Sequence, residues 1–273
     1  MQTFSWQTRD QLRIHGLYWP VDHPVAIVGI VHGLGEHAGR YQHLARRLND
    51  NQVAVVAYDR RGHGQSEGPR GHAPTFDLLL DEIAQLLVAL EMRAPEAPAF
   101  LYGHSMGGNL LLNYLIQRRP KLAGAIVTAP HIRLAFQPSA MQVALGKIMR
   151  GIFPTFTQSN GLDVRQISRD KAVVDAYIAD SLVHDRLTAA LGIGMLEGAA
   201  RLDHYAGPIA VPLLLMHGGA DGITSAAATR DFAARVQGDV QCRIWEGLYH
   251  EIHNEPEQLQ VFQYVWNWMQ ERM

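Results

Sequence analysis

The segment that decides the fold of this chain is residues 99–118, AFLYGHSMGGNLLLNYLIQR. Its first four residues form a short apolar run of the kind found in buried strands, and residues 108–118 have the spacing of a helix. Between them, Gly103-His104-Ser105-Met106-Gly107 matches the G-x-S-x-G nucleophile elbow, a sharp strand-to-helix turn that exposes the serine oxygen. The glycines let neighbouring backbone approach the turn closely. A chance Gly-Ser turn is the alternative, and the flanking strand and helix patterns disfavour it.

Short apolar runs alternate with helical patterns along most of the chain. Several of the runs are continuous stretches of Val, Ile, Leu and Ala, as in strands that are covered on both faces of a parallel sheet. They cover residues 11–19, 25–32, 53–58, 99–102, 122–128, 211–217 and 240–245. Helical stripes occupy residues 76–90, after a capping residue at Thr75, and residues 226–236 and 256–269. The alternation predicts an α/β fold with a doubly wound sheet.

The alternation breaks between residues 131 and 205, where helical patterns occur without a convincing strand. We therefore expect a core made of residues 1–130 and 206–273, with residues 131–205 inserted as a helical cap between the sixth and seventh strands. Within this cap, residues 131–162 contain no Asp or Glu but carry three basic residues. These are Arg133, Lys147 and Arg150.

A helix is predicted early in the cap. Ser139 and Gln142 resemble a capping box, in which each side chain would bond a free backbone N–H of the first turn. Apolar residues follow at helical spacing: Met141, Leu145, Ile148 and Ile152. A basic helix with an apolar face can lie on a membrane or micelle surface. The alternative is that this face packs on the body and roofs the active site, and the sequence leaves both open.

The composition excludes some classes of protein. With 24 basic and 26 acidic residues the net charge is −2, which gives no electrostatic case for binding nucleic acid. The single cysteine, Cys242, cannot form an intrachain disulfide, and its place in a predicted strand favours a buried filler residue over a reactive thiol. The chain shows neither an N-terminal apolar signal region nor a bilayer-spanning run, so we expect a cytoplasmic protein. Its oligomeric state is left open.

A serine nucleophile needs a general base and an acid that orients this base. In folds with this elbow, the acid and the base follow the serine in chain order. Asp221 lies in the loop after the apolar run 211–217, and His250 lies on the loop before the last helix. His253, closer to that helix, is the competing base. We expect Asp221 to hold the imidazole tautomer while His250 takes and returns the proton of Ser105.

An oxyanion hole requires two N–H donors beside the serine. The first should come from the residue after the nucleophile, Met106. The second should come from a loop after an early strand, and the glycine-containing turn His32-Gly33-Leu34-Gly35 predicts the N–H of Leu34. Removal of one such donor typically costs about 3 kcal/mol of transition-state stabilisation.

Metal catalysis is the alternative suggested by the 14 histidines of the chain. The segment His250-Glu251-Ile252-His253 is one residue short of the H-E-x-x-H motif, so its histidines would not lie one helical turn apart. The turn Gly33-Leu34-Gly35 lacks the third glycine of the dinucleotide fingerprint. We therefore expect neither a metal nor an organic cofactor.

Four segments together resemble the monoacylglycerol lipase and lysophospholipase family of the α/β-hydrolase superfamily. They are HGLGEHAGRY at 32–41, DRRGHGQS at 59–66, GHSMGG at 103–108 and YHEIHNEP at 249–256. The middle two are common across the superfamily, whereas the first and last are specific to this branch. The resemblance runs nearly end to end and is weakest in the cap. It implies an α/β-hydrolase fold, with a mostly parallel eight-stranded sheet flanked by helices and an inserted helical cap.

The resemblance also implies an activity: cleavage of carboxylic esters through an acyl-enzyme, with monoacylglycerols, converted to fatty acid and glycerol, as the preferred small-molecule substrate. It places Glu36, Arg40 and His253 near the polar pocket for the glycerol. A salt bridge between Glu36 and Arg40 that only holds the loop is the structural alternative. A lysophospholipase, whose phosphate the basic part of the cap could meet, and a general carboxylesterase are the other enzymatic hypotheses. A non-catalytic binding protein is disfavoured because all three triad candidates are present.

Overall fold

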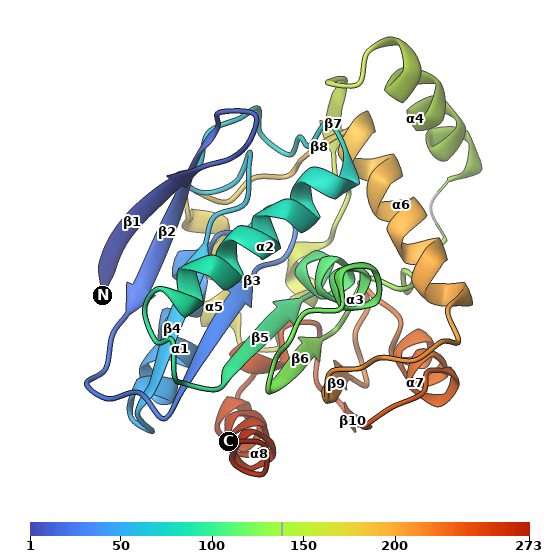
Figure 1. Cartoon of the computed structure of the whole chain (residues 1–273). Helices are drawn as coiled ribbons and strands as arrows, with labels where there is room; N and C mark the ends of the chain where they lie inside the picture. The colour runs from blue at the N-terminus through green and yellow to red at the C-terminus, as the bar shows by residue number, and fades with distance from the viewer. Residues whose placement is uncertain (138) are drawn as a thin grey trace.

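The computed structural model describes residues 1–137 and 139–273, and an eight-stranded sheet runs through its centre (Figure 1). The strand order is β1-β2-β4-β3-β5-β6-β9-β10. The strands are β1 Gln2–Gln7, β2 Arg13–Trp19, β3 Ala26–Val31, β4 Val53–Tyr58, β5 Ala99–His104, β6 Gly124–Thr128, β9 Leu213–Gly218 and β10 Val240–Trp245. Strand β2 pairs antiparallel with both β1 and β4, and all the other pairs are parallel. The predicted α/β fold with a mostly parallel sheet is confirmed.

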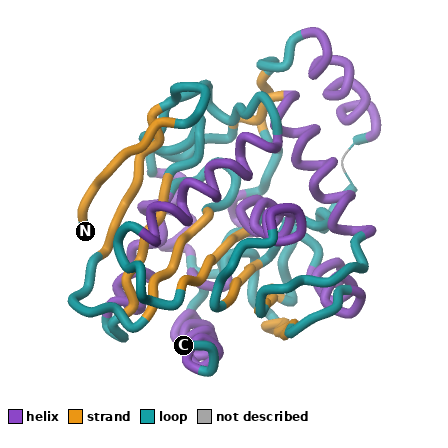
Figure 2. Tube along the Cα trace, in the orientation of Figure 1, coloured by secondary structure: helices purple, strands orange, loops and turns teal. Residues whose placement is uncertain are grey.

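Helices cover both faces of this sheet (Figure 2). On one face lie α2 Phe76–Glu91, α3 Met106–Arg118 and α7 Ala226–Arg235, and on the other lie α1 Gln42–Asn49 and α8 Gln258–Gln270. Strand β3 shows why its sequence is apolar throughout, because every residue in it is buried. Its Ile27 and Val31 join the core on the α2 side, while Val28 and Ile30 join the core on the α1 side.

The helix ends follow local signals in part. Thr75 caps α2 as expected, since its hydroxyl accepts the N–H of Leu78 at 3.4 Å. The last helix begins at Gln258, two residues later than the predicted start at Pro256. Among the described residues, no helix has both the length and the apolar character needed to cross a bilayer.

Residues 131–205 contain α4 Ala140–Ile152, α5 Lys171–Ala179 and α6 Ala189–His204, together with two short strands. Strands β7 Thr157–Ser159 and β8 Arg186–Thr188 pair antiparallel, so the expectation that this region holds no strand is wrong. Three residues are too few to show a period-2 pattern, and the pairing joins segments far apart in the chain. Helix α6 packs into the core through Leu191 and Leu202, and α4 packs beside α6 (Figure 1).

Helix α4 differs from its prediction in two respects. Ser139 stands at its N-cap but makes no side-chain cap hydrogen bond, so the capping box is wrong. Its apolar face does not pack on the body, because Met141 is 78% exposed, Ile148 58% and Ile152 76%. The described part of α4 has no buried residue.

Cys242 also departs from expectation. It is exposed on β10, which is the edge strand of the sheet, so the prediction of a buried filler residue is wrong. An edge strand has a neighbour on one side only, and the apolar pattern of residues 240–245 does not reveal this position.

Candidate active site

Ser105 stands at the point where β5 ends and α3 begins, and its backbone is strained. Its φ of 55° and ψ of −117° lie in a region that non-glycine residues rarely adopt. The turn is held by the Ser105 N–H, which donates to the Thr128 carbonyl at 2.9 Å. A Cβ at Gly107 would overlap the Val31 carbonyl oxygen, and one at Gly103 would lie 2.8 Å from the Gly107 oxygen. The elbow therefore needs both glycines.

The structure brings Ser105, His250 and Asp221 together. The distance from His250 Nε2 to Ser105 Oγ is 2.9 Å, and the distance from His250 Nδ1 to Asp221 Oδ2 is 2.7 Å. Burial disfavours a charged imidazole, but the Asp221 carboxylate outweighs this effect and raises the pKa of His250 above its ordinary value. This arrangement is suited to a base that removes the serine proton and is stabilised once protonated.

Two residues that the sequence analysis did not identify hold Asp221 in place. His217 Nε2 lies 2.9 Å from Asp221 Oδ2, and the Thr224 hydroxyl donates to the same oxygen at 2.9 Å. Backbone N–H groups of Ile223 and Thr224 donate to Oδ1 at 2.7 and 3.0 Å. Burial alone would raise the pKa of Asp221, but His250 and the bond from His217 hold it well below its usual range. The carboxylate therefore stays ionised.

The two predicted oxyanion donors border one cavity together with the serine. Leu34, Ser105 and Met106 all line a space of about 370 Å³. Among the described residues, neither the Leu34 N–H nor the Met106 N–H makes a hydrogen bond. Met106 is also the first residue of α3, where the helix N-terminus favours negative charge. Two residues whose N–H groups have no hydrogen-bond partner in the described part of the chain thus line the same cavity as Ser105.

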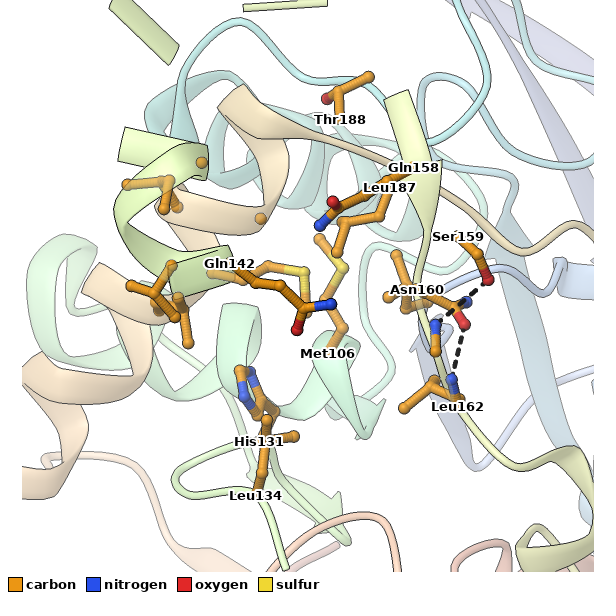
Figure 3. Close-up of a pocket in the computed structure, with 18 of the residues that line it drawn as sticks. Met106, His131, Leu134, Gln142, Gln158, Ser159, Asn160, Leu162, Leu187 and Thr188 are labelled. Atoms are coloured by element: carbon orange, nitrogen blue, oxygen red, sulfur yellow. Dashed lines mark hydrogen bonds between the residues drawn. The ribbon is translucent and has the colours of Figure 1, made fainter. Parts of the chain in front are cut away.

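Most of this cavity is apolar (Figure 3). Its walls come from the segment after β6, from α4, from the β7 segment and from α6, and include Leu134, Val143, Leu162, Leu187 and Ile193. Polar side chains also line it, among them Gln142, Gln158, Ser159 and Asn160. The cavity has the size and surface of a site for a flexible hydrocarbon chain.

A buried ionic cluster lies near Ser105. Arg40 donates to Glu36 at 2.7 Å and makes a bidentate pair with Glu251 at 2.6 and 2.7 Å. The Tyr41 hydroxyl donates to Glu36 at 2.8 Å, and the Arg40 guanidinium lies 4.5 Å from the centre of the Tyr177 ring. The predicted alternative of a Glu36–Arg40 salt bridge is therefore present, and Glu251 joins it.

This cluster borders a second, smaller cavity of about 30 Å³. Glu36, Ser105, Tyr177, His250 and Glu251 line it, so its carboxyl groups share a space with the nucleophile. Burial alone would raise the pKa of Glu251, but Arg40 lowers it to about 2. The sequence analysis missed both Glu251 and Tyr177. Glu251 stood next to His250 in a quoted motif, whereas no local signal marks Tyr177.

His253 lies one layer farther from the serine. Its ring stacks on Tyr41 at 5.1 Å between centroids, and its Nδ1 is 3.3 Å from the Tyr102 hydroxyl. It lines another small space, about 10 Å³, with His43 and Tyr102. Burial is the main cause that lowers the pKa of His253 to about 3, so it stays neutral. Ser105 is bonded to His250 and not to His253.

Comparison with known proteins shows which family the chain resembles over most of its length. The model of the family described as serine aminopeptidase, S33, matches residues 22–257. The chain is 32% identical to the monoacylglycerol lipase of Mycolicibacterium smegmatis over 94% of this chain and 92% of that protein. It is 33% identical to human monoglyceride lipase over 93% of this chain and 86% of that protein.

A solved structure and one further relative extend the comparison. The crystal structure of Paleococcus ferrophilus monoacylglycerol lipase superimposes with a TM-score of 0.88 at 32% identity, covering 95% of this chain and 99% of that one. An uncharacterised abhydrolase domain-containing protein of Dictyostelium discoideum is 38% identical over 92% of this chain. The chain spans only 27% of the length of that protein.

Proposed function

The chain belongs to the serine aminopeptidase S33 family, and from that premise we propose that it hydrolyses monoacylglycerols to fatty acid and glycerol. It is a carboxylic ester hydrolase with an α/β-hydrolase fold. The observation that carries the proposed substrate is that Ser105 lines two cavities of different size and chemistry. One is a large, mainly apolar cavity that fits an acyl chain, and the other is a small cavity in which the carboxyl groups of Glu36 and Glu251 lie beside apolar side chains.

The mechanism follows from the triad distances. His250 Nε2 takes the proton of Ser105 as the serine oxygen attacks the ester carbonyl, and Asp221 stabilises the resulting imidazolium. The N–H groups of Leu34 and Met106 stabilise the negative oxygen of the tetrahedral intermediate. His250 then returns the proton to the departing glycerol oxygen, which leaves an acyl-enzyme on Ser105. Water, deprotonated by the same histidine, releases the fatty acid.

The carboxyl groups that line the small cavity favour a glycerol over a phosphorylated leaving group. Glu36 and Glu251 can accept hydrogen bonds from hydroxyl groups, and Arg40 holds both carboxyl groups in place. His253 supports this wall from behind through Tyr41. A phosphate in the same space would face two carboxyl groups that share one guanidinium. We therefore rank lysophospholipids below monoacylglycerols, with simple carboxylic esters between them.

Helix α4 is proposed as the part of the cap that meets lipid. Its exposed face carries Leu145, Ile148 and Ile152, and Lys147 lies on the same helix. An apolar face with a nearby cation fits a transient contact with a membrane or micelle that presents the substrate. A cytoplasmic location with this peripheral contact stays a prediction.

The test compares substrates and labels the nucleophile. The wild-type chain should cleave 1- and 2-monooleoylglycerol faster than lysophosphatidylcholine and should react with a fluorophosphonate probe. Ser105→Ala should lose labelling and lower the hydrolysis rate by about 10⁶-fold. Activity confined to short soluble esters would contradict the monoacylglycerol assignment, and labelling of Ser105→Ala would contradict the assigned nucleophile.

A further inference from the structure

Arg60 places a positive charge in the interior directly behind the oxyanion loop, residues 32–35. Its side chain is fully buried, and among the described residues no carboxylate forms an ion pair with it. The next residue, Arg61, is the ordinary case, because its guanidinium pairs with Glu82 and with Asp10 at 2.8 Å. An unpaired buried charge is costly, and the guanidinium stays protonated even though burial lowers its pKa.

The guanidinium of Arg60 is directed at two consecutive carbonyl groups. Its Nη1 donates to the His32 oxygen and its Nη2 donates to the Gly33 oxygen at 2.6 Å. The Gly33 oxygen already has another donor, His32 Nδ1 at 2.8 Å. Because His32 Nε2 accepts the Arg60 backbone N–H at 3.0 Å, the proton of this imidazole is on Nδ1. Burial of the Gly33 carbonyl therefore does not by itself require the guanidinium.

The two peptide units that Arg60 contacts have the same arrangement: the carbonyl accepts from Arg60, and the N–H points to an acceptor or is free for one. In the first, the His32 carbonyl binds Arg60, and the N–H of the same peptide, on Gly33, donates to the Glu36 carboxylate. In the second, the Gly33 carbonyl binds Arg60, and the N–H of that peptide belongs to Leu34, a residue that lines the cavity beside Ser105. The Gly33 N–H already donates to a carboxylate, whereas the Leu34 N–H, without a partner in the described part of the chain, is free to donate to an oxyanion.

We propose that Arg60 is a positioning residue for the oxyanion hole: it orients the Gly33–Leu34 peptide and polarises it, so that the Leu34 N–H becomes a stronger donor to the substrate's oxyanion. This proposal rests on the ester hydrolase activity proposed above. A hydrogen bond to the carbonyl of an amide strengthens donation by the N–H of the same amide, because chains of hydrogen bonds polarise one another. The guanidinium also supplies a fixed positive charge close to where negative charge develops.

We expect substitution of Arg60 to weaken stabilisation of the transition state, which lowers kcat, rather than substrate binding. Complete removal of an oxyanion donor lowers kcat by about 10²- to 10³-fold, and Arg60 only strengthens and orients one donor. We therefore expect Arg60→Met to lower kcat by about 10- to 100-fold, with KM changed less than about twofold, since the ground-state ester makes weak use of the hole. Arg60→Lys keeps the charge but lacks the fork that reaches both carbonyls, so its kcat should lie between those of wild type and Arg60→Met.

The experiment uses p-nitrophenyl butyrate, so that it does not depend on acylglycerol specificity. Three quantities are measured for wild type, Arg60→Met and Arg60→Lys: kcat per fluorophosphonate-titrated site, KM, and the inhibition constant of a trifluoromethyl ketone. This ketone adds the serine oxygen and forms a hemiketal oxyanion in the hole. Arg61→Met is the matched control, a buried arginine on the adjacent residue whose partners are Glu82 and Asp10.

The proposal predicts that kcat falls and the ketone binds more weakly by the same factor in both Arg60 variants. It predicts for Arg61→Met a lower melting temperature, with kcat per titrated site and ketone affinity within about threefold of wild type. Arg60 variants that lose thermal stability but keep kcat per titrated site and ketone affinity would overturn it. If Arg60→Met yields no titratable enzyme, an Arg60→Lys variant with wild-type kcat and ketone affinity overturns it equally. Cleavage of the p-nitrophenyl ester without cleavage of monooleoylglycerol would contradict the proposed substrate alone.

Discussion

In the floor of the active site, the polar atoms of Ser105, His250 and Asp221 are held by hydrogen bonds of 2.7 to 2.9 Å inside the protein. Helix α4, by contrast, has no buried residue in its described part, and Ile152 is 76% exposed. The chemistry at the floor depends on the geometry of individual hydrogen bonds. The role proposed for α4 depends on its exposed apolar surface. If α4 makes the proposed lipid contact, then bond-breaking and lipid contact reside in separate parts of the chain and can be altered one at a time.

Among changes that leave the floor folded, Asp221→Asn should cause the largest loss of activity. The backbone N–H groups of Ile223 and Thr224 would still hold the amide oxygen, but the amide NH2 would take the place of Oδ2 beside His250 and could not stabilise its imidazolium. By analogy with the triad Asp-to-Asn change, kcat should fall about 10⁴-fold. Rates on monooleoylglycerol and on p-nitrophenyl butyrate should fall by the same factor. A loss of less than tenfold on either substrate would show that Asp221 does not serve the histidine.

The pH dependence tests the electrostatics of the floor. His250 acts as a base only when neutral, and Asp221 raises its pKa above 6.5. Below that raised pKa, kcat/KM should fall about tenfold for each unit of pH, and above it kcat/KM should level off. Measurement of kcat/KM between pH 5 and 9 on a soluble ester checks the midpoint. A midpoint below 6.5 would mean that desolvation of the imidazole outweighs its carboxylate partner.

The smallest expected effect comes from substitutions on the exposed face of α4. The double change Ile148→Ser with Ile152→Ser removes exposed apolar surface from α4. Hydrolysis of monooleoylglycerol presented in vesicles should fall about five- to tenfold, since each side chain contributes about 0.5–0.7 kcal/mol on partial burial in lipid. The rate on p-nitrophenyl butyrate should stay at the wild-type value.

Val88→Ser is the matched control for α4, because Val88 is 55% exposed on α2. It should leave both rates unchanged. An equal loss of activity on vesicles with Val88→Ser, or a loss on the soluble ester with the α4 variant, would remove the distinction between the two regions.

Prediction from the sequence succeeded where the signal was local. The strand, the glycine-flanked turn and the helix around Ser105 follow one another in the chain, and each has its own pattern. Asp221 and His250 were identified because both follow late strands of a parallel sheet, whose carboxyl ends meet at one edge. That their side chains bond each other and Ser105 is a finding of the structure.

Prediction failed where a residue's environment is made by distant segments. Tyr177 contacts Arg40 only because α5 folds back over the loop after β3. Strands β7 and β8 pair with each other although α5 lies between them in the chain. The Ser139 capping box matched a local pattern that the structure does not use. Cys242 looked buried because the sequence pattern of an edge strand resembles that of an inner one.

The sheet-and-helix fold and the order of nucleophile, acid and base could be predicted from the sequence, because apolar period, glycine turns and chain order are properties of neighbouring residues. The groups that surround these residues are known only from the folded chain. Folding brings the carboxyl groups of Glu36 and Glu251 into one cavity with Ser105 and lines a second, larger cavity at Ser105 mainly with apolar side chains. It also sets an unpaired arginine, Arg60, behind the oxyanion loop. Burial, charge pairing and hydrogen-bond partners arise from contacts between segments that the chain order keeps apart.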